Sequence, residues 1–289
     1  MKRLLSFGHG YSARALTKIL PKDAWRITGT TRSEDKTEML EEEGVNPVIW
    51  PGSDLTEEIE KMTHLLISPA PTSDGDPVLA EWSSMIATAE HLEWVGYLST
   101  TGVYGDHDGG WVDENTPLAP STKRGQLRVL AEGQWQSLAS KYDLPLHIFR
   151  LAGIYGPGRG PFAKVRNGTA RRIIKKNQVF SRIHVDDIAQ VLAASIKQPN
   201  PGAIYNLCDN FAAPPEDVIG HAAELLGLPL PEAVDFETAE MTRMARSFYA
   251  ESKRVRNNKI KDELGVKLLY PDYQTGLAAL LELERITNE

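Results

Sequence analysis

The sequence is poor in cysteine and in long apolar runs. Cys208 is its only cysteine, so no internal disulfide can form and nothing points to an oxidising compartment. No stretch approaches the roughly 20 apolar residues that a membrane-spanning helix needs. The apolar run after Met1 is too short for a signal peptide, because it leads directly into glycines. We therefore expect a cytoplasmic protein with no membrane partner.

The chain also has no excess of positive charge, because acidic residues outnumber basic ones. The 289 residues include 32 Lys+Arg and 39 Asp+Glu, which gives a formal net charge of −7. Nucleic-acid binders usually carry a basic domain, so nucleic acid is not an expected partner. No Cys/His cluster has the spacing of metal ligands, so no metal site is expected. Neither the G-x-S-x-G nucleophile elbow nor the G-x-x-x-x-G-K-[ST] phosphate loop occurs.

Short apolar runs alternate with segments of helical spacing in the first half of the chain. The helical segments are residues 12–20, 78–90 and 126–140. Strand–helix alternation predicts right-handed βαβ units, and hence an α/β protein with a doubly wound parallel sheet. The strand–helix pairs are too few for an eightfold barrel. The expected strands are residues 3–7, 25–30, 47–50, 64–68, 94–99 and 146–149.

The second half is less regular and begins with a Gly-, Pro- and Arg/Lys-rich stretch. A further strand, helix and strand are expected at 182–185, 186–197 and 203–207, and the chain after residue 214 is mainly helical. We expect two lobes. The dinucleotide-binding lobe comprises residues 1–152 and 183–207, and a smaller substrate lobe comprises residues 153–182 and 208–289.

A glycine-rich turn follows the first expected strand. Gly8-His9-Gly10-Tyr11-Ser12-Ala13 fits G-x-G-x-x-G/A directly before a helix. Gly8 permits the tight turn, Gly10 leaves room for a pyrophosphate, and Ala13 allows close packing of helix and strand. The pyrophosphate would lie on the free N–H groups of the helix, including those of Tyr11 and Ser12. The turn therefore predicts a dinucleotide site.

The end of the second strand indicates which dinucleotide is bound. An NAD site usually has Asp or Glu there, but this chain reads Thr31-Arg32-Ser33. The Arg32 guanidinium suits the 2′-phosphate of NADP, and the Thr31 and Ser33 hydroxyls add donors. We expect NADP as the cofactor in preference to NAD. The alternative is that Arg32 is an ordinary surface residue.

The glycine turn and several later motifs make the chain resemble the extended short-chain dehydrogenase/reductase family, often labelled NAD-dependent epimerase/dehydratase. The resemblance implies a Rossmann lobe with a small C-terminal substrate lobe. It also implies that Asp54 and Leu55 lie near the adenine and that Ser68, Pro69 and Ala70 line the cofactor cleft. The blocks that carry it follow in order along the chain: the glycine turn, Gly52-Ser53-Asp54-Leu55, Ser99-Thr100-Thr101-Gly102-Val103-Tyr104-Gly105, Arg150 to Tyr155-Gly156-Pro157, Arg182-Ile183-His184-Val185-Asp186-Asp187, and Tyr205-Asn206-Leu207.

The family's catalytic motif is altered here. The family uses a Ser or Thr followed by Y-x-x-x-K, and Thr100 matches the hydroxyl. Glu132 matches a glutamate common after the motif, and counting back puts Arg128 at the lysine and Arg124 at the tyrosine. Arginine stays protonated, so Arg124 cannot be a general base, whereas Arg128 can hold ribose or phosphate oxygens. The sequence resembles an atypical branch of the family, as does its segment 253–265.

Other side chains are candidates for the missing acid or base. These candidates are Tyr104, Tyr155 and His184. Each also has a structural interpretation: the two tyrosines could be packing residues, and the histidine could fix a strand-to-helix turn. In the basic run of residues 159–182, Arg159 and Arg166 are candidates for binding an anionic substrate. The alternative is that this run is a solvated helical face.

Two functions stay open on the sequence alone. The first is an NADP-dependent oxidoreductase or an epimerase/dehydratase-like enzyme that acts on a small, anionic molecule. The second is a non-catalytic NAD(P)-binding redox sensor or regulatory module, which the loss of the tyrosine favours. Helices 78–90 and 126–140 are where related proteins often dimerise, which favours a homodimer. The alternative is that the apolar stripes of these helices are part of the core.

Overall fold

A seven-stranded parallel sheet forms the centre of the molecule in the computed structural model, which describes residues 1–288. Its strands are β1 (Lys2–Phe7), β2 (Trp25–Thr31), β3 (Asn46–Ile49), β4 (His64–Ile67), β5 (Trp94–Thr100), β7 (Leu146–Leu151) and β11 (Ile204–Leu207). Their order is β11-β7-β5-β4-β1-β2-β3, with every neighbouring pair parallel. The direction of strand addition reverses between β1 and β4, where such folds bind ligands. The predicted fold class is confirmed.

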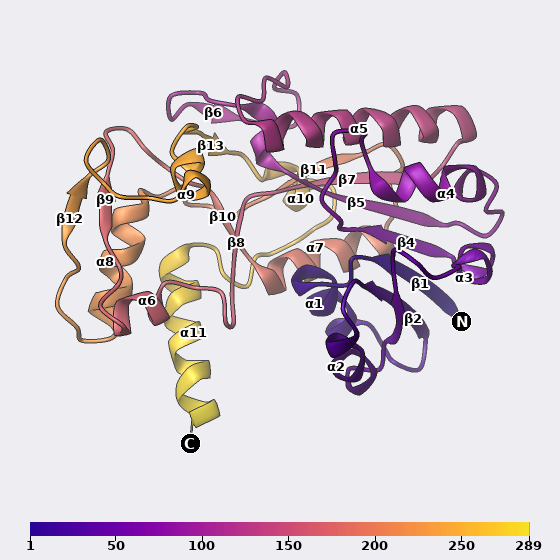
Figure 1. The fold of residues 1–289 in the computed structure, drawn as a ribbon, viewed down its shortest axis with the longest axis horizontal. Helices are drawn as coiled ribbons and strands as arrows, with labels where there is room; N and C mark the ends of the chain where they lie inside the picture. Colours follow the sequence, from indigo (N-terminus) through magenta and orange to yellow (C-terminus); the bar gives the residue numbers. More distant parts are fainter. Residues whose placement is uncertain (289) are drawn as a thin grey trace.

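Helices cover both faces of this sheet (Figure 1). On one face, α1 and α7 pack against each other and bury Leu16 and Val191 with Leu4 of β1. On the other face, α3, α4 and α5 bury Ile59, Trp82 and other side chains against the sheet. The short helices α2 and α3 were not expected from the sequence. The helices are α1 (Tyr11–Ile19), α2 (Thr37–Glu42), α3 (Thr56–Lys61), α4 (Pro77–Ala87), α5 (Lys123–Tyr142), α7 (Val185–Lys197) and α10 (Asn258–Asp262).

The expected strands before residue 150 match the observed ones closely, but residues 182–185 do not join the central sheet. They form β10 (Arg182–His184), which pairs in parallel with β8 (Gly153–Tyr155) in a two-stranded sheet. The apolar run correctly predicted a strand here, but it could not indicate that this strand pairs with β8. Two further parallel pairs are β6 (Trp111–Val112) with β13 (Arg254–Val255), and β9 (Arg172–Ile174) with β12 (Ala233–Asp235).

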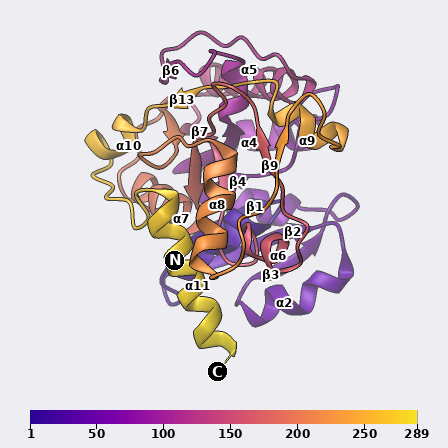
Figure 2. The ribbon, with the colours of Figure 1, turned by 90° about the vertical axis from the view of Figure 1, so that its left-hand side faces the viewer.

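A second hydrophobic core lies beside the sheet. It joins α6 (Phe162–Arg166), α8 (Pro215–Leu225) and α11 (Tyr273–Asn288), and α8 and α11 lie side by side in both views (Figures 1 and 2). The segment that contains α9 (Arg243–Phe248) runs from this lobe toward the N-terminal end of α5. Ile260 and Val266 pack into the core of the central sheet, so the C-terminal segment contacts both lobes. The lobe boundaries given above stay a prediction.

No helix within residues 1–288 is both long enough and apolar enough to cross a membrane.

Candidate functional site

The glycine turn closes the C-terminal end of β1. Gly8 has a φ of +69°, and a Cβ there would lie 3.2 Å from the Pro69 ring, so this position favours glycine. The Gly8 N–H donates to Thr30 Oγ1 at 2.8 Å, which ties the turn to β2. Gly10 precedes α1 without a side-chain cap, so first-turn N–H groups are left for a ligand. The geometry fits a pyrophosphate.

Gly10→Val should weaken NADPH binding without unfolding the protein. A Cβ at Gly10 would have only the Gly8 carbonyl oxygen within 4 Å, at 3.7 Å, so the unliganded fold has room for it. A bound pyrophosphate would take that room, and overpacking a filled space costs about 1–3 kcal/mol. Fluorescence titration should show binding about ten- to a hundredfold weaker. Wild-type affinity with a normal melting temperature would place the cofactor elsewhere.

The Ser68 side chain supports a ligand beside the turn. Ser68 follows β4 and lines the same cavity as Gly8 and Gly10. Its buried Oγ has no hydrogen-bond partner among the described residues, and buried hydroxyls usually have one. Pro69 contacts the turn, whereas Ala70 is exposed and is not among the cavity-lining residues. An orphaned hydroxyl at this place fits a bound ribose or phosphate.

The residues expected at the adenosine end lie outside the main cavity. Arg32 is exposed after β2, and Thr31 Oγ1 accepts a hydrogen bond from the Ser33 N–H at 3.3 Å. Asp54 is exposed and accepts hydrogen bonds from Thr56, which lower the pKa of its carboxyl. The Leu55 side chain is fully buried in the core beside α3. Only the backbone of Leu55 could therefore face an adenine.

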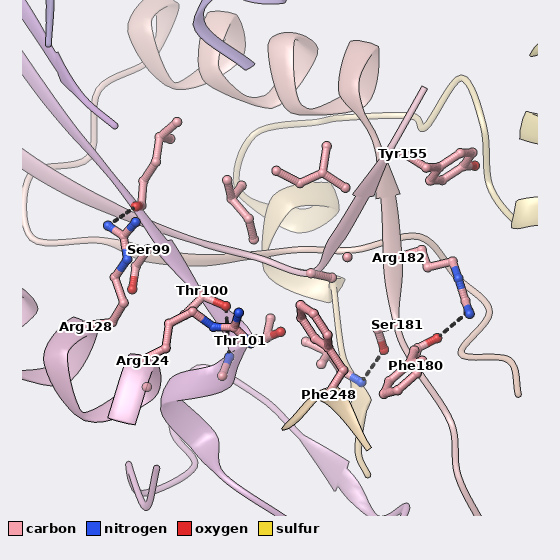
Figure 3. A pocket seen from close by; sticks show the side chains of 18 of the residues that line it. Ser99, Thr100, Thr101, Arg124, Arg128, Tyr155, Phe180, Ser181, Arg182 and Phe248 are labelled. Atoms are coloured by element: carbon pink, nitrogen blue, oxygen red, sulfur yellow. Dashed lines mark hydrogen bonds between the residues drawn. The ribbon is translucent and has the colours of Figure 1, made fainter. Parts of the chain in front are cut away.

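The cavity itself has a volume of about 790 Å³ and opens where β1, β4, β5 and β7 end. Thr100 ends β5, and its Oγ1 accepts a hydrogen bond from the Gly102 N–H at 3.1 Å. Arg124 and Arg128 lie one turn apart on α5, and both line the cavity. Figure 3 shows Arg124 beside Thr100 and Arg128 beside Ser99. The structure thus brings together Thr100, Arg124 and Arg128, the three residues that the sequence resemblance aligns with a catalytic motif.

The two arginines are held differently. Arg128 Nη1 donates to the Leu98 carbonyl and the Tyr97 hydroxyl, both at 2.9 Å, and to the Pro69 carbonyl at 3.3 Å. Arg128 is therefore fixed along the wall between β4 and β5. The Arg124 guanidinium instead stacks on Phe248 of α9, 4.5 Å from the ring centroid. Stacking covers one face of Arg124 and leaves its N–H edge for a planar anion.

A buried ion pair sets the register of α5. Glu132 and Arg150 are 1% and 3% exposed, and Arg150 donates to both Glu132 carboxylate oxygens, at 2.8 and 3.2 Å. Ser99 also donates to Glu132. This network links α5 to β5 and β7, so the helix cannot turn without breaking it. It therefore directs Arg124 and Arg128 toward the cavity.

Neither candidate tyrosine is placed to exchange protons there. Tyr104 is fully buried, donates to Asn206 Oδ1 at 2.7 Å and accepts from Arg150 at 3.0 Å, and burial raises its pKa to about 12. Tyr155 lines the cavity, but its hydroxyl donates to the Asp272 carbonyl at 3.4 Å. Its side chain points away from Thr100 and Arg124 in Figure 3, and burial raises its pKa. Both placements match the packing interpretation.

His184 lies at the turn from β10 to α7, which matches its structural interpretation. Its Nδ1 accepts the N–H of Asp186 at 3.2 Å and so caps α7. The ring is 1% exposed, and burial lowers its pKa.

The two candidate substrate arginines are not brought together. Arg159 lines the cavity, with its guanidinium 5.8 Å from the ring of Tyr11 in the glycine turn. Arg166 instead donates to Glu284 of α11 at 2.5 Å on the outer side of the second lobe. The basic run had no signal that separated these two, because the contact with α11 forms only in the folded chain.

The second lobe adds cavity residues that sequence reasoning missed. Phe180, Phe248, Tyr249, Glu251 and Lys253 all line the cavity. The segment that contains Lys253 stood out only by resemblance, and its spacing has no motif that points to a site. The charged lining consists of Arg124, Arg128, Arg159, Arg182, Lys253 and Glu251. The cavity is therefore positive although the chain is negative.

The fold and the glycine turn define a Rossmann-type dinucleotide fold with an added C-terminal lobe. Residues 84–208 match the model of the NAD dependent epimerase/dehydratase family. The matched segment is less than half of the chain, and the match shows that this segment is similar to that family.

Several known proteins are similar over nearly the whole chain. A conserved protein of unknown function from Silicibacter pomeroyi DSS is 59% identical, with a TM-score of 0.92 and 98% and 99% of the two chains covered. Protein YeeZ of Escherichia coli K12 is 28% identical over 94% of this chain and 97% of its own. UDP-glucuronic acid 4-epimerase from Bacillus cereus, solved with NAD, shares the fold at 15% identity and a TM-score of 0.78, with 99% and 100% covered.

Proposed function

We propose that the chain is a cytoplasmic, NADP(H)-dependent oxidoreductase or epimerase/dehydratase-like enzyme that acts on a small anionic molecule. One observation carries this proposal: a single cavity holds the glycine turn, Thr100, Arg124 and Arg128. The similarity of residues 84–208 to the NAD dependent epimerase/dehydratase family and the NAD in the Bacillus cereus epimerase support it.

The cofactor would be held by groups that the fold leaves unpaired. The N–H groups in the first turn of α1, those of Tyr11, Ser12 and Ala13, would bind the pyrophosphate. Ser68 Oγ, which has no partner among the described residues, lines the same cavity and would contact the nicotinamide ribose. Arg128 lines it too, and its guanidinium N–H groups other than those of Nη1 would be the donors to that ribose. The bound nicotinamide supplies hydride transfer, and Thr100 would hydrogen-bond the reacting oxygen of the substrate.

The charge of the cavity supports an anionic substrate. Five cationic side chains and one carboxylate line it, so the lining has a net positive charge. A bound anion would neutralise part of that charge. Arg124 presents its N–H edge beside Thr100, and a guanidinium edge binds carboxylate or phosphate through paired hydrogen bonds. In this proposal Arg124 takes the place of the tyrosine as a substrate anchor, not as a base.

Arg32→Ala should remove a preference for NADPH over NADH. Arg32 is exposed at the end of β2, where an arginine can pair with a 2′-phosphate. Losing a hydrogen bond to a charged group costs about 1.5–3 kcal/mol. Calorimetry should show weaker NADPH binding and unchanged NADH binding. Equal affinities in the wild-type protein would contradict the assignment of NADP.

NADPH titration with a screen of anionic carbonyl compounds tests the proposed enzyme. Cofactor oxidation by one of them supports it. The alternative is a non-catalytic redox sensor or regulatory module, and the fixed charge of Arg124 together with the inward-packed tyrosines favours it. Tight NADPH binding without turnover of any compound would support the sensor or regulatory module instead of the enzyme.

We also propose a homodimer through α4 and α5. A groove of about 810 Å³ runs between these helices, and Leu130 and Tyr142 on its lining are 43% and 42% exposed. Sedimentation velocity distinguishes a dimer from a monomer.

A further inference from the structure

An ion pair from the second lobe lies in the cavity wall. Lys253 and Glu251 are 8% and 9% exposed, and both line the cavity. Lys253 Nζ donates to Glu251 Oε2 and to the Gly105 carbonyl, each at 2.7 Å. Burying such a pair has a desolvation cost, and packed apolar residues often stabilise a fold equally well. Unlike the Glu132–Arg150 pair, this pair also lines the cavity.

The pair is connected to the protein surface. Glu251 Oε1 accepts a hydrogen bond from Ser121 Oγ at 2.7 Å, and Ser121 is exposed just before α5. A continuous chain of hydrogen bonds thus runs from an exposed hydroxyl through a carboxylate to an ammonium in the cavity wall.

Lys253 also lines the same cavity as Thr100 and Arg124. Gly105 directly follows the turn η2 (Thr101–Tyr104), which begins after Thr100. An ammonium has three N–H donors, and Gly105 and Glu251 take two of those of Lys253. The third is left for a ligand in the cavity that Lys253 lines.

We propose that Lys253 is the proton donor that replaces the missing tyrosine, a role that rests on the proposed function. Bound reduced nicotinamide would supply a hydride to the carbonyl carbon of the substrate, and the electron pair of the C=O π bond would move to oxygen. That oxygen takes a proton from Lys253 Nζ, which leaves a neutral amine and an alcohol. Ser121 would take a proton from solvent as it gives its own to Glu251 Oε1, and the neutral Glu251 carboxyl would rotate to bring that proton to the Lys253 amine, which restores the ammonium and the carboxylate. In alcohol oxidation each transfer runs in reverse.

Pyridoxal 5′-phosphate, an anionic aldehyde, tests whether the Lys253 amine faces the cofactor cavity. The full chain is treated with it, the imine is reduced with borohydride, and labelled lysines are identified by peptide mass spectrometry. Lys123, exposed at the start of α5, is the control. We expect Lys253 to be labelled. NADPH at about ten times its Kd should cut that labelling about tenfold and leave Lys123 unchanged.

Lys253→Arg separates proton donation from a structural role. Arginine keeps the charge and the donors to Gly105 and Glu251 but does not give up a proton. The variant should keep the wild-type melting temperature and NADPH affinity, while kcat falls at least about 100-fold. Full kcat in this variant would overturn the proposal.

Two labelling outcomes would also overturn it: Lys253 unlabelled while Lys123 is labelled, or Lys253 labelled equally with and without NADPH. Failure of NADPH to bind would overturn the proposed function and the role of Lys253 together. Bound NADPH with an unlabelled Lys253 would overturn that role alone.

Discussion

Arg124→Ala should abolish most of the catalytic activity and leave NADPH affinity within about twofold of wild type. Arg124 lines the cavity beside Thr100 and belongs to α5, not to the glycine turn that would bind the pyrophosphate. Removing one fixed donor at a reacting or anchoring oxygen costs about 10²–10³ in kcat. Steady-state kinetics and NADPH titration on the same preparation measure both quantities.

The matched control is Arg166→Ala. Arg166 is also a half-exposed arginine, but it pairs with Glu284 on the outer side of the second lobe. The Arg166→Ala variant should change neither kcat nor NADPH affinity. Arg124→Lys should not restore activity, because an ammonium lacks the planar edge of a guanidinium. Wild-type kinetics in Arg124→Ala would show that this residue does not contact the substrate.

Arg150→Met should lower the free energy of unfolding by about 3–5 kcal/mol, because it leaves a buried carboxylate without its partner. Glu132 is 1% exposed and receives two hydrogen bonds from Arg150. Tyr104 would also lose the Arg150 donor. Urea denaturation followed by tryptophan fluorescence measures the change.

The double variant Glu132→Leu with Arg150→Met provides the control. With both charges removed, much of the lost stability should return, since an apolar pair of similar size often replaces a buried ion pair without loss. An Arg150→Met variant as stable as wild type would show that the pair does not fix α5 in the fold.

The parts of the site that the sequence predicted depend on local rules. Gly8 and Gly10 were identifiable because backbone sterics require glycine in such a turn. The strands were identifiable from short apolar runs that the parallel sheet buries on both faces. Glu132 gave a register for α5 that puts Arg124 and Arg128 on one side of the helix. The structure directs that side into the cavity.

The parts that escaped prediction depend on contacts between distant segments. Tyr155 could not be oriented from sequence, because its hydroxyl is directed by Asp272 before α11. Lys253 and Phe248 reach the cavity only after the second lobe has packed against η2 and α5. The short helices α2 and α3 have too few residues for a clear apolar period.

A crystal structure of the chain with NADPH tests the central claim most directly. The pyrophosphate should lie at the glycine turn, on the N–H groups of Tyr11, Ser12 and Ala13, and the nicotinamide should lie between Thr100 and Arg128. The N–H edge of Arg124 should face the open substrate side of the ring. NADPH bound elsewhere, or Arg124 turned away from the nicotinamide, would contradict it.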